Sequence, residues 1–185
     1  DLKGQVYDRR SGNYDFMRLA SLLREEFNSQ ISADRNGKFK FINDEYYRKS
    51  NEGITSDKFK IYIAILLKDL SKKVDKEEEL TVFNLLSKNI SSIITTNYDN
   101  LIEEVTEFEP LVGNNILLSN PYGSVYKIHG SVDSPEELVF TTEDYDDFDQ
   151  RYDLIRAQLI SLFVHNPIVF LGYSVNDTNI KKILS

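Results

Sequence analysis

The sequence predicts an α/β fold, in which a mainly helical first half precedes a parallel sheet flanked by helices. Apolar residues recur at helical spacing through much of the first half of the chain. From residue 90 onward, short β-branched runs alternate with helical patterns, which indicates a parallel sheet with right-handed crossovers. Three of these runs end in small and polar residues, at the edge where open α/β sheets bind their ligands.

The length and the composition are those of a globular domain with a sizeable core. The chain has 185 residues, of which 41% are hydrophobic and 28% are charged. We expect a single domain over residues 1–185, with a mainly helical part at 1–89 and an α/β part at 90–185. Because the chain does not begin with Met, we expect an excerpt of a longer multidomain protein or a processed product.

The residue counts disfavour several classes of site and partner. The chain contains no cysteine, which excludes disulfides and zinc sites built on thiolates, and two histidines cannot form a structural zinc site by themselves. No apolar run approaches the ~18 residues that span a bilayer, and the N-terminus carries no secretory pattern. We therefore expect a cytoplasmic protein without zinc and without a membrane partner.

The net charge of −8 is unevenly distributed along the chain. Residues 1–93 carry 17 basic and 15 acidic side chains, whereas residues 94–185 carry 5 basic and 15 acidic ones. Nucleic-acid binding requires a basic surface that neutralises phosphates. The half that carries the polar strand ends is acidic, so we expect no nucleic acid as the primary ligand.

Three helices are predicted in the first half of the chain, at residues 14–27, 58–71 and 77–88. The second of them is apolar most of the way round, which indicates a buried helix. Residues 28–57 are polar and irregular, and whether they contain a helix is left open. The predicted inward residues are Phe16, Leu19, Leu23 and Phe27 in the first helix and Leu80, Val82, Phe83 and Leu86 in the last.

The second half of the chain contains the predicted strands. Thr142 is the predicted N-cap of a helix, with Glu143 and Asp144 well placed for the helix dipole. The predicted strands are residues 90–95, 116–118, 125–128, 138–140 and 168–171. The predicted helices are 100–107, 152–165 and 175–184, and the expected inward residues of 152–165 are Leu154, Ile155, Leu159 and Leu162.

The first polar strand end is the run from Thr95 to Asp99. The carboxamide of Asn97 can hold a carboxamide or a ribose hydroxyl through its two donors and two acceptor sites. Asp99 can accept a hydrogen bond from the same ligand, or it can brace the turn. The alternative is that both residues only end the strand and cap the next helix, because Asn and Asp are ordinary turn residues.

The second polar strand end is His129-Gly130. Gly130 permits a tight turn, which we expect to leave the imidazole of His129 exposed at the strand end. A histidine there can act as a general base or acid near neutral pH, and the alternative is a hydrogen-bonded structural histidine. His165 lies at a helix C-terminus before Pro167, so we expect it to interact with the helix dipole rather than to catalyse.

The third polar strand end is Gly172-Tyr173-Ser174, with Asp177 close behind. A glycine lets the backbone approach a phosphate or a sugar closely, with N–H groups at the start of the following helix. The alternative is a plain turn between a strand and a helix. The acidic run over residues 143–149 lacks the pattern of a calcium loop, so we expect a solvated helix face there.

Together these residues resemble the sirtuin-like NAD-binding superfamily, and most closely its bacterial branch, which is found in anti-phage defence effectors. The resemblance covers residues 90–184, where four motifs occur in the family's order and spacing. The matching segments are Thr95-Thr96-Asn97-Tyr98-Asp99 with Leu101 and Glu103, Lys127-Ile128-His129-Gly130, Phe140-Thr141-Thr142-Glu143-Asp144-Tyr145, and Phe170-Leu171-Gly172-Tyr173-Ser174 with Asp177.

The resemblance implies a Rossmann-like domain that binds NAD at the carboxyl edge of the sheet. It implies a catalytic role for Asn97 beside the nicotinamide ribose, and one for His129 on the ribose hydroxyls or on the attacking group. Asp99 would help to form the nicotinamide pocket, and Gly172 and Ser174 would lie along the adenosine half. The implied NAD-binding residues are Thr96, Asp99, Gly130, Gly172, Tyr173, Ser174 and Asp177.

The implied activity is that of a sirtuin-like NADase, which hydrolyses its substrate NAD to ADP-ribose and nicotinamide and so causes abortive infection. Such effectors form homo-oligomers and respond to a protein or small-molecule activator of phage origin or signalling. The alternative is a non-catalytic NAD- or ADP-ribose-binding or protein-interaction module of the same fold.

Two departures from the family pattern bear on this assignment. The family's opening Gly-Ala-Gly-type loop, which cradles the pyrophosphate, has no counterpart here, so we expect an excerpt that lacks part of the NAD site. Because the effectors of this branch stay silent until a trigger assembles them, we also expect that the isolated chain can be inactive. The four-cysteine zinc module of the protein deacylases is also absent from the sequence, which argues against NAD-dependent deacylation.

Overall fold

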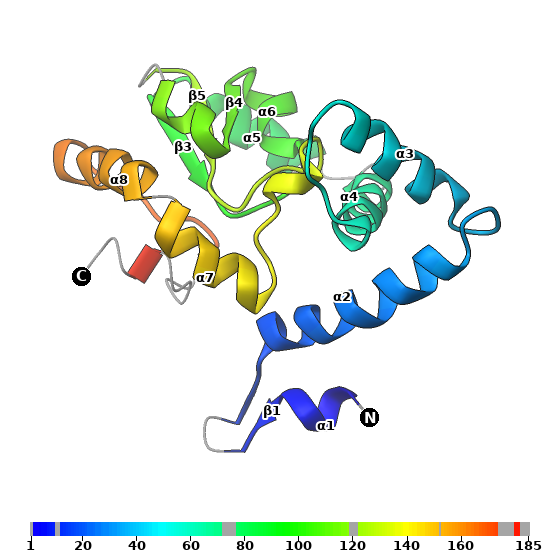
Figure 1. Ribbon diagram of the computed structural model, residues 1–185. Coiled ribbons are helices and arrows are strands. Elements are labelled where there is room, and N and C mark those ends of the chain that lie inside the picture. Colours follow the sequence, from blue (N-terminus) through cyan, green and yellow to red (C-terminus); the bar gives the residue numbers. More distant parts are fainter. Residues whose placement is uncertain are drawn as a thin grey trace.

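The computed structural model describes residues 2–9, 12–71, 77–118, 122–151, 153–173 and 180–181. Figure 1 shows the helical first half of the chain beside a small sheet, with two further helices after the sheet. The predicted α/β class, with a parallel sheet flanked by helices and a helical N-terminal half, is confirmed.

A three-stranded parallel sheet forms the centre of the second half. Strands β3 (Ser92–Thr95), β5 (Ser124–Lys127) and β4 (Glu109–Val112) lie in the order β3-β5-β4. All four residues of β5 are buried, because this strand has a neighbour on both sides. The register pairs Thr95 of β3 with Lys127 of β5, so the carboxyl ends of these two strands meet at one edge.

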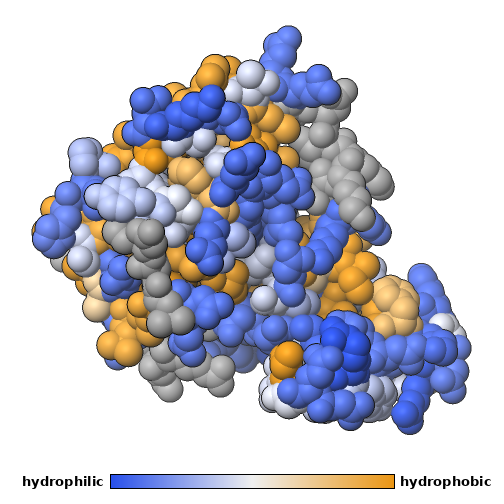
Figure 2. Space-filling view, turned by 90° about the horizontal axis from the view of Figure 1, so that it is seen from above, coloured by the Kyte–Doolittle hydropathy of each residue, from blue (hydrophilic) through white to orange (hydrophobic). Residues whose placement is uncertain are grey.

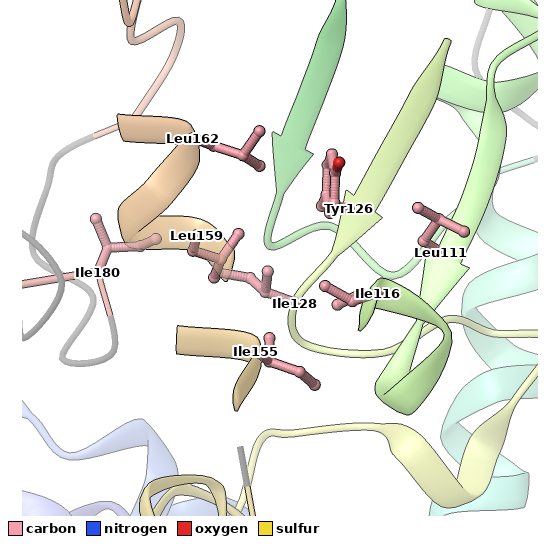
Figure 3. Packing of buried hydrophobic residues seen from close by; sticks show 8 residues of the cluster. All are labelled: Leu111, Ile116, Tyr126, Ile128, Ile155, Leu159, Leu162 and Ile180. Carbon is pink, nitrogen blue, oxygen red and sulfur yellow. The ribbon is translucent and has the colours of Figure 1, made fainter. Parts of the chain in front are cut away.

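The main core lies between one face of the sheet and helix α8 (Asp153–His165). Figure 3 shows Tyr126 and Ile128 among the residues that meet there. Leu154, which we expected to face inward, is 68% exposed; it is rotated by about 100° from the buried Ile155 that follows it. The core residues are Tyr126 and Ile128, then Ile155, Leu159 and Leu162 of α8, and Leu111, Ile116 and Ile180.

A second core holds together helices α2 (Phe16–Ala33), α3 (Lys40–Asn51) and α4 (Lys58–Ser71). The predicted helices at 14–27 and 58–71 are thereby confirmed, although Phe16 is 72% exposed rather than inward. The Asp15 carboxylate caps α2 by accepting the N–H of Arg18 at 2.9 Å. The buried side chains of this core are Ile31, Ile42 and Ile61.

Much of the polar region 28–57 is helical, in the end of α2 and in α3. A mostly polar helix such as α3 carries little apolar periodicity, and its packing depends on a few buried groups. One of them is Asn43, whose carboxamide donates to the carbonyls of Ile31 at 2.9 Å and Phe39 at 3.1 Å. One contact joins α3 to the end of α2 and the other lies within the first turn of α3, and no sequence pattern predicts either of them.

The predicted helices at 77–88 and 100–107 are confirmed as α5 (Glu77–Ser87) and α6 (Leu101–Thr106). In α5 the expected inward residues Val82 and Leu86 are 57% and 50% exposed. The helix instead turns Asn84 toward α6, where its carboxamide donates to a backbone carbonyl. The other described elements are α1 (Leu2–Val6), the antiparallel pair β1 (Tyr7–Asp8) and β2 (Asn13–Tyr14), and the 3-10 helices η1 (Gly113–Leu118) and η2 (Pro135–Glu137).

The predicted strands at 90–95 and 125–128 are confirmed as β3 and β5, but three others are wrong. Residues 116–118 belong to η1, and residues 138–140 form no strand. Residues 168–171 were expected to be a buried strand, yet Val169 is 78% exposed, because no described strand lies beside this segment to cover it. Strand β4 was missed because it contains Pro110, which only an edge strand tolerates.

Two buried lysines join the helical half to the second half. Lys60 of α4 donates to the Leu138 carbonyl and to the Asp144 carboxylate, both at 2.6 Å. Lys49 of α3 forms an ion pair with Glu136 at 2.9 Å. Each contact ties a helix of the second core to the segment that follows β5, so the two halves of the chain cannot separate without breaking charged contacts.

Helix α7 (Thr142–Arg151) begins one residue after its cap. The cap is Thr141, not Thr142 as predicted: its hydroxyl accepts the N–H of Asp144 at 3.2 Å, and the Asp144 carboxylate accepts the N–H of Thr141 at 3.1 Å. Burial alone would raise the pKa of Asp144. The charge of Lys60 and these hydrogen bonds outweigh burial and hold the pKa of Asp144 below its ordinary value.

The turn after β5 depends on Gly130, which has a φ of +89°. A Cβ at this position would lie 2.3 Å from the carbonyl oxygen of Glu137. The turn therefore requires glycine both for its left-handed backbone and for the close approach of the segment at 137–138.

The predicted helix at 175–184 falls mostly outside the described residues, of which 180–181 are helical. Among the described helices, none has the length and apolar character needed to cross a membrane.

We expect Asp144→Asn to make unfolding less sensitive to acid. The folded pKa of Asp144 is lowered, so its contribution is present above the ordinary aspartate pKa of about 4 and is lost as the pH falls through the folded pKa. At pH 7 the variant should lose about 2 kcal/mol, because Lys60 then lacks an anionic partner. Urea unfolding between pH 7 and pH 3 measures both effects. Asp44→Asn, at an exposed carboxylate, is the control, and equal acid sensitivity in wild type and D144N would contradict the assignment.

We expect Gly130→Ala to destabilise the fold by about 3 kcal/mol, because a methyl group adds a backbone clash to the strain of a positive φ. Gly53→Ala is a matched control, since Gly53 has a φ of +77° and nothing within 4 Å of an added Cβ. It should lose only about 1–2 kcal/mol. Thermal unfolding of both variants measures the difference, and equal losses would show that the contact with Glu137 contributes nothing.

Candidate functional site

The candidate site lies where β3 and β5 end side by side. The run from Thr95 to Asp99 follows β3, and His129-Gly130 follows β5. The N–H of Ile128 donates to the Thr95 carbonyl at 3.1 Å, and further on the N–H of Val132 donates to the Tyr98 carbonyl at 2.9 Å. The structure thus brings the first two predicted polar strand ends together.

Asn97 is exposed at the tip of the first turn. Its backbone N–H donates to the Thr95 hydroxyl at 3.0 Å, which fixes the turn without using the side chain. Within the part of the chain that the structure describes, no hydrogen bond engages the Asn97 carboxamide, so its donors and its acceptor are available for binding. Thr96, next to it, is half-buried.

Asp99 braces the start of α6. One of its carboxylate oxygens accepts the N–H of Leu101 at 3.0 Å, and its carbonyl accepts a hydrogen bond from the Lys127 ammonium. The bracing role that we considered for Asp99 is therefore observed. Its role in a nicotinamide pocket stays a prediction.

Tyr98 and Asn100 attach the same turn to its surroundings, and neither was singled out from the sequence. The Tyr98 hydroxyl donates to the Val139 carbonyl at 2.8 Å. The Asn100 carboxamide donates to Asp133 at 2.5 Å, and Lys68 of α4 also pairs with Asp133. The hydrogen bond from Lys68 holds the pKa of Asp133 below its ordinary value. The turn is thus anchored to the helical half as well as to the sheet.

His129 is buried, with 3% of its surface exposed, so the expectation of an exposed imidazole is wrong. Its ring meets the rings of Tyr145 and Phe148 edge to face, with centroids 5.4 and 6.5 Å away. Both residues belong to α7, which covers the strand end. Gly130 does not expose the histidine; its missing side chain lets the segment at 137–138 pack closely against the turn.

Lys127 has no role of its own in the sequence prediction, yet it is a fully buried cation at this edge of the sheet. Its side chain is 0% exposed, and its ammonium lies 2.6 Å from the Glu103 carboxylate. The sequence does carry a signal for this buried cation, because Lys127 interrupts a β-type run that is otherwise apolar. Because burying an unpaired charge is costly, such a lysine indicates a buried partner.

The third polar strand end is not brought to the first two by any described contact. Gly172 is exposed, with a φ of +60°. Tyr173 packs against the core under the sheet, and its ring stacks on Phe170 at 6.1 Å. Ser174 and Asp177 lie outside the described residues.

A surface hollow of about 420 Å³ lies near the site, between α3, α4 and the segment at 132–135. It includes Asp133 but neither Asn97 nor His129. Its cationic side chains are paired, Arg48 with Glu45, Lys49 with Glu136 and Lys68 with Asp133. Figure 2 shows hydrophobic areas lying between hydrophilic ones on the face seen from above. Within the described ranges, no three His, Asp or Glu side chains gather as a metal site would require.

Relatives of this chain include two NAD(+) hydrolases and a defence-associated sirtuin. The NAD(+) hydrolase ThsA of Enterococcus faecium is 32% identical over 150 residues, which is 76% of this chain and 30% of the relative. The NAD(+) hydrolase ThsA of Bacillus cereus is 31% identical over 149 residues, again 76% and 30%. Defense-associated sirtuin 2 of Bacillus subtilis is 32% identical over 129 residues, 65% of this chain and 13% of the relative. The chain thus spans a third or less of the length of these relatives.

The family model of the SIR2-like domain matches residues 91–185. The match begins directly before β3 and contains both turns of the candidate site. It agrees with the region over which the sequence motifs resemble sirtuin-like proteins. Since it covers half of the chain, the chain belongs to the family of SIR2-like domains.

Proposed function

We propose that this domain binds NAD as its substrate and hydrolyses it to ADP-ribose and nicotinamide. The observation that carries the proposal is that the turn with the unengaged Asn97 carboxamide and the turn with His129 follow neighbouring parallel strands and are joined by backbone hydrogen bonds. Support comes from the family match and from relatives that are named NAD(+) hydrolases. The name of the Bacillus subtilis relative, a defense-associated sirtuin, supports a role in defence. We include action against phage, with abortive infection through NAD depletion, in the proposal.

The chemistry of the proposal needs few groups. The bond between nicotinamide and ribose breaks with its electron pair leaving on nicotinamide, through an oxocarbenium-like state, and water then adds to the ribose with loss of a proton. In the proposal, Asn97 holds the nicotinamide ribose through its carboxamide and Asp99 lies beside the nicotinamide. An acidic surround stabilises the developing positive charge.

His129 has the second catalytic role in the proposal, on the ribose hydroxyls or on the attacking water. Tyr145 and Phe148 cover its ring, so α7 has to shift before His129 can contact a substrate. This requirement fits an effector that stays silent until an activator of phage origin or signalling assembles it into a homo-oligomer. We include that activator, the oligomer and a cytoplasmic location in the proposal.

In the proposal, NAD also contacts Gly130, next to His129, and Thr96, next to Asn97. The adenosine half of NAD is held by Gly172, Tyr173, Ser174 and Asp177.

A second candidate is a non-catalytic module that binds NAD, ADP-ribose or a protein. The burial of His129 favours it, because a buried imidazole needs no substrate to explain its position. Deacylation has less support, because the sequence has no cysteine for the zinc module of the deacylases.

We expect Asn97→Ala and His129→Ala to reduce NAD hydrolysis by the full-length, activated protein about 100-fold or more. Nicotinamide release, measured by chromatography, is the assay. Asn114→Ala and His165→Ala are matched controls, because both residues are exposed and lie outside the site. Both controls should retain wild-type activity.

Because His129 is buried, its replacement by alanine removes packing under α7, so thermal unfolding must accompany the assay. His129→Gln, which fills more of the space, separates lost packing from lost chemistry. If the activated wild type releases no nicotinamide yet binds NAD or ADP-ribose, the hydrolase is excluded and the binding module is the better account.

A further inference from the structure

We infer that Lys127 and Glu103 form a positioning pair, which holds the Asn97–Asp99 turn in the geometry that NAD cleavage requires. The inference rests on the proposed function. It assigns roles to two residues that contact no substrate in the proposal and that act through the backbone of the turn.

The pair connects three parts of the site edge. Lys127 ends the central strand β5, and its ammonium bonds both the Glu103 carboxylate of α6, at 2.6 Å, and the Asp99 carbonyl of the turn. Lys127 is two residues before His129, and Asp99 is two residues after Asn97. A single buried side chain thus ties the two catalytic turns of the proposal to one another.

Stability alone does not explain this lysine. Side chains alternate across a strand, so Lys127 lies on the face opposite to Tyr126 and Ile128, which are in the main core. The preceding residue on the same face, Val125, is completely buried. An apolar residue at position 127 would fit such a site, and buried ion pairs replaced by apolar residues often leave a protein as stable or more so. What an apolar residue cannot do is hold the Asp99 carbonyl.

Lys127 holds the carbonyl of the Asp99–Asn100 peptide. The following peptide is held as well, because the Asp99 carboxylate accepts the N–H of Leu101 at 3.0 Å. Without the lysine, the carbonyl loses its buried donor and the peptide plane is free to turn. Asn97 is attached to the same short loop, so its carboxamide would then move relative to His129.

Glu103 depends on Lys127. One of its carboxylate oxygens bonds the ammonium, and the other is buried without a hydrogen-bond partner among the described residues. Removing Lys127 alone therefore leaves a buried, unpaired carboxylate, and that variant should be unstable for a reason unrelated to positioning. The informative change is the double replacement Lys127→Met with Glu103→Met, which removes both charges and keeps the volume.

The test compares thermal unfolding and NAD hydrolysis for wild type, K127M and K127M/E103M in the full-length protein. We expect K127M to lower Tm and the double variant to recover it. The kcat of the double variant should stay about 10- to 100-fold below wild type, with KM changed about threefold or less, because a misplaced group weakens the transition state more than the binding of substrate. Wild-type kcat in a double variant of recovered Tm would overturn the inference.

The control pair is Lys49→Met with Glu136→Met. These residues form an ion pair at 2.9 Å with side chains 8% and 22% exposed, and no described contact joins them to residues 97–100. We expect this double variant to keep wild-type kcat. An equal loss of kcat in both double variants would show a general effect of removing buried charge, and would also overturn the inference.

Amide hydrogen exchange tests the positioning role of Lys127 and Glu103 independently of NAD cleavage. In K127M/E103M, a peptide covering residues 97–101 should exchange at least about 10-fold faster than in wild type, while peptides from α4 should not change. Unchanged exchange at 97–101 overturns the positioning role whether or not the protein cleaves NAD. If wild type never releases nicotinamide but exchange at 97–101 rises in the variant, the proposed function fails and the positioning of the turn stands.

Discussion

The parallel pairing of β5 with β3 determines where the residues of the candidate site lie. Because Thr95 is opposite Lys127, the two strands end at the same level, and the turns that carry Asn97 and His129 start as neighbours. A shift of the register by one residue would also move Lys127 to the face occupied by Tyr126, against the core beneath α8. The pairing, the core and the buried charge therefore enforce the same register.

The helical first half contributes to the site through charged contacts rather than through apolar packing alone. Lys60 bonds the Leu138 carbonyl and the Asp144 carboxylate at the start of α7. Lys68 pairs with Asp133, which accepts a hydrogen bond from Asn100 of the turn after β3. Both lysines belong to α4, so one helix is connected to both sides of the candidate site. The site is thus not a property of the SIR2-like match at 91–185 alone.

The parts of the fold and of the candidate site that could be predicted from the sequence are those that depend on interactions between residues close together in the chain. The ends of β3 and β5 could be predicted because β-branched runs that stop at Asn-Tyr-Asp or at His-Gly are local patterns. The burial of His129 could not, because it depends on α7 packing over the strand end. The partner of Lys127 is equally non-local: an unexpected lysine in a β-type run predicts that a partner exists but not that it is Glu103. The exposure of residues 168–171 was missed for a similar reason, since apolar sequence indicates burial whether or not a neighbouring strand is present.

Asn97 and His129 lie on adjacent turns but in opposite environments, and this contrast constrains any mechanism that uses both. A substrate can reach the exposed Asn97 directly, whereas it reaches the imidazole only if Tyr145 and Phe148 move. Those residues are on α7, whose first turn is held by Lys60 and by a hydrogen bond from Ser21 of α2 to Glu143 at 2.8 Å. A displacement of α2 or α4 would therefore be transmitted to the cover of His129. If NAD cleavage requires this histidine, the helical half of the chain controls the access of the substrate to it.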